Sequence, residues 1–129
     1  MDKPAFRKPK LHFDSSTHPS HVTFDDGKDQ RRNLPWHGYV EARWDYAEPD
    51  IIMIGIGECL VLVRGHNLAP LFQAIEEHAL ARLRAQPELE NDREHEVDTF
   101  AVEVRFMKPP PGIGVGKRTE PTELGLELP

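Results

Sequence analysis

Four consecutive residues, Arg64-Gly65-His66-Asn67, carry the side chains best suited to bind an anion. They lie between a predicted strand and a predicted helix, and the free backbone N–H groups at a helix N-terminus attract negative charge. A guanidinium, an imidazole and a carboxamide beside those groups could hold a phosphate or a carboxylate. Arg64, His66 and Asn67 are therefore the candidate anion-binding residues. The alternative is structural: Gly65 makes a turn, Asn67 caps the helix, and Arg64 and His66 are solvated.

An acidic side chain occupies every second position between residues 88 and 98. In an extended chain these carboxylates would project to one side and form a polyanionic edge, an acidic interaction loop. The spacing lacks the central Gly and the final Glu of a calcium loop, so a basic partner fits better than calcium. The acidic residues are Glu88, Glu90, Asp92, Glu94, Glu96 and Asp98.

The basic partner of this loop has two possible sources. Its basic partner could be another protein, or it could be the N-terminal segment of the same chain, which would dock onto the loop within the molecule. The alternative is a flexible loop whose charges are simply solvated, as most charge runs are. The basic residues of the N-terminal segment that could dock are Lys3, Arg7, Lys8, Lys10, Arg31 and Arg32.

The remaining groups give weaker signals for catalysis or metal binding. The consecutive Glu-Glu-His of residues 76–78 would spread around a helix and not converge. His18 and His21 have a ligand-like spacing and His12 is near, but their segment offers no fourth ligand in register. Cys59 is the single cysteine, with no neighbouring base to activate it. We therefore expect no catalytic residues, no metal and no cofactor, and hence not an enzyme.

Hydropathy patterns between Trp36 and Lys108 predict the elements that position these residues. Alternation indicates strands at 40–46 and 99–106, and two apolar runs at 51–56 and 59–63 indicate a hairpin with Gly57-Glu58 at its turn. Apolar residues three and four positions apart predict one long helix from Asn67 to Gln86, which Pro87 ends. The predicted fold is a small α+β domain of order β-β-β-α-β, with a mostly antiparallel sheet and the long helix on one face.

Composition divides the chain into a head (1–35), a domain (36–108) and a tail (109–129). The head contains few large aliphatic residues and the tail is rich in Pro and Gly, so we expect a disordered or weakly structured head and a disordered tail. The chain has a net charge of −6, and residues 36–108, with seven basic and fourteen acidic side chains, carry most of it. Nucleic acid is therefore disfavoured as a partner. The apolar run 51–63 is too short and too interrupted to cross a bilayer, so no membrane association is expected.

The predicted hairpin is apolar on both faces, which bears on function. Ile51 and Met53 point away from Ile52 and Ile54, and one helix can cover only one face of a sheet. The second face could be covered by a tail, a second copy of the chain or another protein, or the fold could wrap so that both faces are interior. We expect a homodimer that packs sheet on sheet.

The predicted function is that of a small cytoplasmic binding or assembly module that acts through this apolar sheet face and flexible tails. Leu124, Leu126 and Leu128 alternate with polar residues and could add a strand to a sheet edge. The cytoplasmic setting is expected because a single cysteine cannot form an intramolecular disulfide. The alternative function is a ligand-binding protein or enzyme that uses the anion site at Arg64–Asn67.

Overall fold

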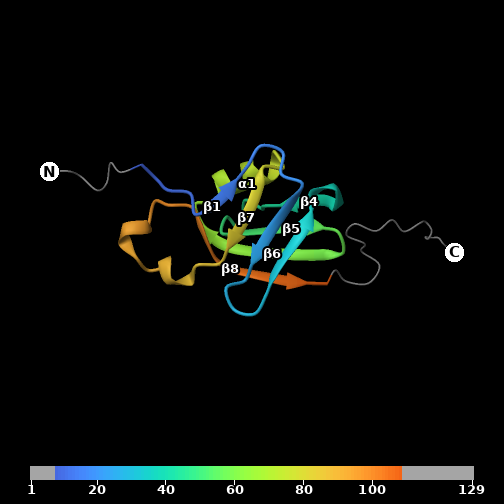
Figure 1. Cartoon of the computed structure of the whole chain (residues 1–129). Helices are drawn as coiled ribbons and strands as arrows, with labels where there is room; N and C mark the ends of the chain where they lie inside the picture. The colour runs from blue at the N-terminus through green and yellow to red at the C-terminus, as the bar shows by residue number, and fades with distance from the viewer. Residues whose placement is uncertain (1–7, 109–129) are drawn as a thin grey trace.

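The computed structural model describes residues 8–108, which fold into two four-stranded sheets and a short helix (Figure 1). The strand orders are β1-β7-β2-β3 and β4-β5-β6-β8. All pairs are antiparallel except β2 with β7, so the predicted α+β class with mostly antiparallel pairing is confirmed. The elements are β1 (Phe13–Ser15), β2 (His21–Asp25), β3 (Arg31–Pro35), η2 (Trp36–Gly38), β4 (Tyr39–Arg43), β5 (Ile51–Ile56), β6 (Cys59–His66), α1 (Ala69–Glu76), β7 (Leu80–Arg84), η3 (Pro87–Leu89), η4 (Arg93–His95) and β8 (Phe100–Met107).

The predicted central hairpin is present. Strands β5 and β6 pair in antiparallel register up to Ile56 opposite Cys59, and Gly57 at the turn has φ +62°. Only glycine adopts this conformation without a steric cost, which is why the turn falls there. The preceding strand is shorter than predicted: β4 ends at Arg43, and Tyr46 is fully exposed in the turn that follows.

The prediction of a disordered head is wrong for residues 8–35. They form β1, β2 and β3, and the side chains of Val22 and Phe24 on β2 are completely buried. Composition predicted disorder because residues 8–35 are polar on average. Their few large apolar residues nevertheless occupy core positions. Residues 1–7 and the predicted tail 109–129, with the strand-like leucines near its end, lie outside the described residues.

The prediction of a long helix from Asn67 to Gln86 is also wrong. Helix α1 ends at Glu76, and residues 80–84 form β7, which lies between β1 and β2. The helix ends in a Schellman motif: the N–H groups of His78 and Ala79 donate to the carbonyls of Ile75 and Ala74 at 3.0 and 2.8 Å. His78 takes the left-handed position, φ +53°, that glycine usually occupies. No helix within residues 8–108 is long and apolar enough to cross a membrane.

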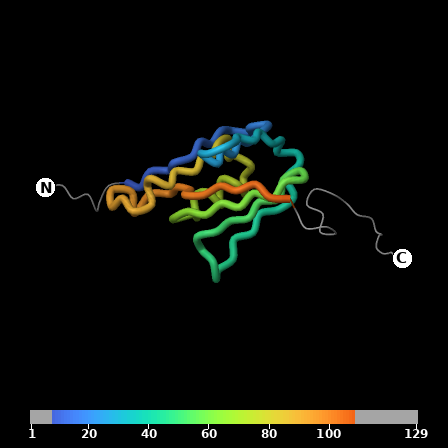
Figure 2. Tube along the Cα trace, turned by 90° about the horizontal axis from the view of Figure 1, so that it is seen from below, coloured from blue at the N-terminus to red at the C-terminus, as the bar shows by residue number. Residues whose placement is uncertain are grey.

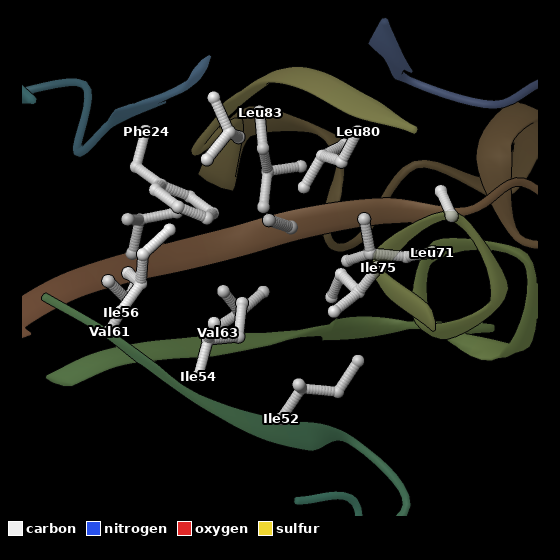
Figure 3. Close-up of a cluster of buried hydrophobic side chains, with 14 of the residues drawn as sticks. Phe24, Ile52, Ile54, Ile56, Val61, Val63, Leu71, Ile75, Leu80 and Leu83 are labelled. Atoms are coloured by element: carbon white, nitrogen blue, oxygen red, sulfur yellow. The ribbon is translucent and has the colours of Figure 1, made fainter. Parts of the chain in front are cut away.

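A layer of apolar side chains fills the space between the two sheets (Figure 3). Strand register places Ala42, Ile54, Val61 and Phe106 in one row across the second sheet, and Ile52, Val63 and Val104 in the next. The first sheet contributes Phe24 from β2 with Leu80 and Leu83 from β7, while Leu71 and Ile75 of α1 lie beside the layer. Apart from the half-buried Ala42 and Phe106, these side chains are buried, and this burial is the main source of folding free energy.

The two outer faces differ in chemistry. Across the first sheet one row reads Asp14, Arg82, Thr23, Asn33, which is entirely polar. Across the second sheet the matching row reads Arg43, Met53, Leu62, Arg105, with two half-buried apolar residues at its centre. Ile51, Leu60 and Met107 are half-buried in the neighbouring rows of that face, whose strands lie side by side in Figure 2. The predicted two-sided apolar character of β5 and β6 is therefore present.

Phe24→Ala tests whether the N-terminal strands are part of the cooperative fold. We expect it to lower the free energy of unfolding by about 3–5 kcal/mol, because it leaves a cavity in the layer between the sheets. Leu11→Ala, at a position 51% exposed, is the control and should change it by less than about 0.5 kcal/mol. Urea denaturation followed by circular dichroism measures both. If both substitutions lowered the free energy of unfolding by equally small amounts, β2 would not pack as described.

Candidate functional site

The structure separates the three candidate anion-binding residues. Arg64 and His66 are on β6 and both lie near Glu90, at 3.4 and 3.9 Å. The Arg64 Nε also donates to Glu103 Oε1 at 3.2 Å. The hydrogen bond from Arg64 helps to hold the pKa of Glu103 below its usual range, after the larger effect of a hydrogen bond from Arg105. The guanidinium of Arg64 therefore binds two carboxylates of the same chain, those of Glu90 and Glu103.

Asn67 does not cap the helix. Leu68 occupies the N-cap position without a side-chain cap, and Asn67 has φ +52°. Its Nδ2 donates to the carbonyl oxygens of Glu96 and Asp98 at 3.1 and 2.8 Å. The Thr99 hydroxyl donates back to the Asn67 carbonyl at 2.6 Å. Asn67 thus fastens the acidic loop to the end of β6, a role its position next to the helix did not reveal.

Gly65 is required by a close approach and not by a turn. It lies within β6, where the pairing with β8 shifts register between Arg64 and Gly65. A Cβ at this position would lie 2.1 Å from the Phe100 carbonyl oxygen, so any side chain would force the two strands apart. The interpretation of Gly65 as the turn residue is therefore wrong.

A groove of about 530 Å³ runs beside β8, and Arg64 is one of its lining residues. Lys28, Asp29, Glu103 and Arg105 also line it, so its walls carry both signs of charge. His66 and Asn67 are not among the lining residues. The proposed combination of guanidinium, imidazole and carboxamide around one anion does not form a shared pocket, and anion binding there stays a prediction.

The acidic loop is not extended as its alternation suggested. It contains the two short helices η3 and η4, so its carboxylates face different partners. Glu90 meets Arg64, Asp92 accepts the Glu94 N–H at the start of η4, and Asp98 is completely buried. The predicted single polyanionic edge is therefore wrong. Its use as an interaction loop for a basic protein stays a prediction.

The N-terminal segment does dock onto this loop, through other groups than those predicted. Leu11 forms a parallel bridge with Thr99, the Thr99 N–H donates to the Lys10 carbonyl at 3.0 Å, and the Lys10 N–H donates to Asp98 Oδ1 at 2.9 Å. These contacts use the Lys10 backbone. The guanidinium of Arg32 instead lies over the Phe106 ring, 5.5 Å from its centroid, and Lys3 and Arg7 lie outside the described residues.

Two imidazoles and one carboxylate converge where this segment meets the loop. His12 Nε2 and His95 Nδ1 lie 3.0 and 2.9 Å from the same oxygen, Asp98 Oδ2. The two rings meet edge-on with centroids 5.4 Å apart, and His12 also contacts the edge of Phe100. The rings of His12 and His95 are 18% and 22% exposed, so one side of the cluster reaches solvent.

His12 does not lie with His18 and His21, the histidines near it in sequence. His18 is an exposed residue with φ +53°, and the His21 ring pairs with the adjacent Ser20 hydroxyl. The residues that join His12 come from more than eighty positions along the chain. Their only local signal was the last of the alternating acidic residues, Asp98, immediately before a strand.

Cys59 is the remaining reactive group. It is 3% exposed, and burial raises the pKa of its thiol above the ordinary value. The thiol is therefore protonated at neutral pH, which opposes a role as a nucleophile. Cys59 is a packed core residue on β6.

No family model, no curated protein and no solved structure matches this chain.

The Glu103 carboxylate predicts how stability depends on pH. Its pKa is lowered in the folded state by hydrogen bonds from Arg105 and Arg64, so its contribution is present above the unfolded-state pKa and is lost as pH falls through the folded-state pKa. We expect Glu103→Gln to lower the unfolding free energy at neutral pH and to flatten its decline between about pH 5 and about pH 3. Urea titrations across this range measure the slope.

A double-mutant cycle with Arg105→Gln is the control. Because Arg105 is the main donor to Glu103, the two substitutions should be less than additive at neutral pH and additive once the carboxylate is protonated. A Glu103→Gln slope identical to that of the wild type would show that these ion pairs do not persist in solution.

Proposed function

We propose that this chain is a binding and assembly module whose outer face on the β4-β5-β6-β8 sheet packs against a second copy. The observation that carries the proposal is the difference between the two outer faces. The first sheet turns a polar row to solvent, while the second places Met53 and Leu62 at the centre of its face. Leu60 and Met107 lie on one side of them, and Ile51 and the ion pairs of Glu103 with Arg64 and Arg105 lie on the other. The outer face of the first sheet is polar, so folding alone does not require the outer face of the second sheet to be apolar.

The charges around this face favour a second copy over an unrelated partner. On the edge strand β4, the exposed residues Glu41 and Arg43 are two positions apart and project from the same face. A two-fold axis that crosses the strands between them would stack β4 on its own copy in the opposite direction. Glu41 of each protomer would then face Arg43 of the other, and Leu60 would face Leu62. The face is self-complementary, as an isologous dimer requires.

The size of the face sets the expected affinity. Four strands of about six residues make a rectangle of about 19 by 20 Å, or about 400 Å² per protomer. About 800 Å² in total is below the about 1,200–2,000 Å² that stable specific interfaces bury, and falls among weak, transient contacts. The dimer should therefore be weak and concentration-dependent, with a dissociation constant in the micromolar range or above.

Sedimentation equilibrium of the full chain tests this proposal, at concentrations from about 1 to about 500 µM. We expect a monomer–dimer equilibrium that Leu62→Lys shifts to monomer, because the dimer would have to bury the charge of a lysine at the centre of the face. Val97→Lys replaces an equally apolar residue, 42% exposed on the acidic loop, and should leave the equilibrium unchanged. A wild-type chain that is monomeric throughout this range would contradict the proposal.

Charge reversal on β4 tests the orientation of the two copies. Glu41→Arg or Arg43→Glu alone would bring like charges together across the two-fold axis and weaken the dimer. The double substitution restores opposite charges and should recover the wild-type equilibrium. If the double variant is as weak as the single ones, the two copies do not stack β4 on β4.

The proposal places the protein in a reducing, cytoplasmic setting. Its single cysteine is buried and has no second cysteine to pair with. Chains that work in oxidising compartments and are of this size commonly rely on disulfides, which this one does not.

A further inference from the structure

We propose that His12, His95 and Asp98 bind a divalent transition-metal ion, with Zn²⁺ as the first choice. This departs from the expectation, drawn from the sequence, that the protein has no metal. Imidazole nitrogen and carboxylate oxygen are the donors that Zn²⁺ and its first-row neighbours take in proteins. The three donor atoms all lie within 4.8 Å of one another.

The two separations to the Asp98 carboxylate fit ligands of one ion. Two donors about 2.0–2.1 Å from an ion are about 2.9–3.4 Å apart when the angle between them is about 90–110°. Asp98 Oδ2 is 3.0 Å from His12 Nε2 and 2.9 Å from His95 Nδ1, at the lower end of this range. Small rotations of the His12 and His95 rings toward solvent would make room for the ion. The backbone would not have to move.

A backbone hydrogen bond to its other oxygen holds the Asp98 carboxylate in this orientation. Asp98 Oδ1 accepts the Lys10 N–H at 2.9 Å, which leaves Oδ2 directed at both imidazoles. The Asp98 carbonyl is itself fixed by Asn67, and the neighbouring Thr99 N–H by the Lys10 carbonyl. A ligand whose orientation is set by backbone hydrogen bonds is the arrangement that precise metal sites need.

His95 has a carboxylate within reach of its second ring nitrogen. Its Nδ1 faces Asp98, and its other nitrogen, Nε2, lies 3.8 Å from Asp92 Oδ2, beyond hydrogen-bond distance. If the ring turned toward a bound ion and closed this gap, the resulting hydrogen bond would fix the tautomer that presents a lone pair to the metal. Asp92 is in turn held at the start of η4, where it accepts the Glu94 N–H.

The position of the site suggests what the ion would do. Figures 1 and 2 both show the start of the described chain, in blue, beside the loop 88–98, in orange. An ion shared by His12 and Asp98 would lock these two segments together. Within residues 8–108 this cluster supplies three donors where a tetrahedral ion takes four, so a water or a small ligand would complete the coordination on the solvent side.

The same distances also suit two ordinary N–H to carboxylate hydrogen bonds, and the experiment must separate the two. The full chain, without an affinity tag and stripped with a chelator, is titrated with Zn²⁺ in competition with a chromophoric chelator. We expect one Zn²⁺ per chain. His12→Ala and His95→Ala should each lower the affinity at least about 100-fold, and Asp92→Asn, which removes only a supporting group, about 10–100-fold.

Two controls keep the result independent of folding defects. His21→Ala and His37→Ala remove exposed imidazoles elsewhere and should bind Zn²⁺ like the wild type. Co²⁺ bound to the unmodified chain should show an absorption spectrum of an ion with nitrogen and oxygen ligands, and Zn²⁺ should displace it. No stoichiometric ion in the wild type, or affinity lost equally in the control variants, would overturn the proposal and leave a hydrogen-bonded His-Asp-His cluster.

Discussion

The reversal of the chain at residues 77–79 is the constraint on which the other parts of the structure depend. Because α1 ends at Glu76, residues 80–84 are free to pair as β7 with both β1 and β2. The left-handed His78 would cost about 1–2 kcal/mol for a residue with a side chain. Its ring stacks on Trp36 at 4.7 Å with the planes 9° apart, and the Trp36 Nε1 donates to the Leu80 carbonyl at 3.0 Å. These contacts offset the strain and fix where the strand begins.

The sequence predicted those elements whose signals are local. The hairpin of β5 and β6 has continuous apolar runs and a glycine at the turn, and the last strand has a clean alternation, so both could be identified. Residues 80–84 could not, since Leu80 and Leu83 also continue the helical spacing of Leu71 and Ile75. The usual signal for a helix end is a glycine at the position of His78. Ring contacts with residues distant in sequence, Trp36 and Tyr39, make a histidine acceptable there.

The functional groups were predicted by type better than by arrangement. The Arg64–Asn67 segment and the acidic loop do meet, as Arg64 with Glu90 and as Asn67 with the Asp98 carbonyl, but the two had been treated as separate sites. Alternation of charge suggested six equivalent carboxylates. Burial makes them unequal, because Asp98 precedes β8 and is covered by the N-terminal segment. That covering depends on pairing between residues 10–12 and 98–99, which no local pattern encodes.

The position of β7 in its sheet has a consequence for the order of folding. Strands β1 and β2 are close in sequence but do not pair with each other, because β7 lies between them and pairs Phe13 with Leu83 and Thr23 with Arg82. During synthesis, β1 therefore has no strand to pair with until residues 80–84 have been made, and β2 has only β3. The hairpins of β2 with β3 and of β5 with β6 have no such delay. Folding should begin there and end with closure of the first sheet, a non-local step of the kind that makes β-rich domains slow folders.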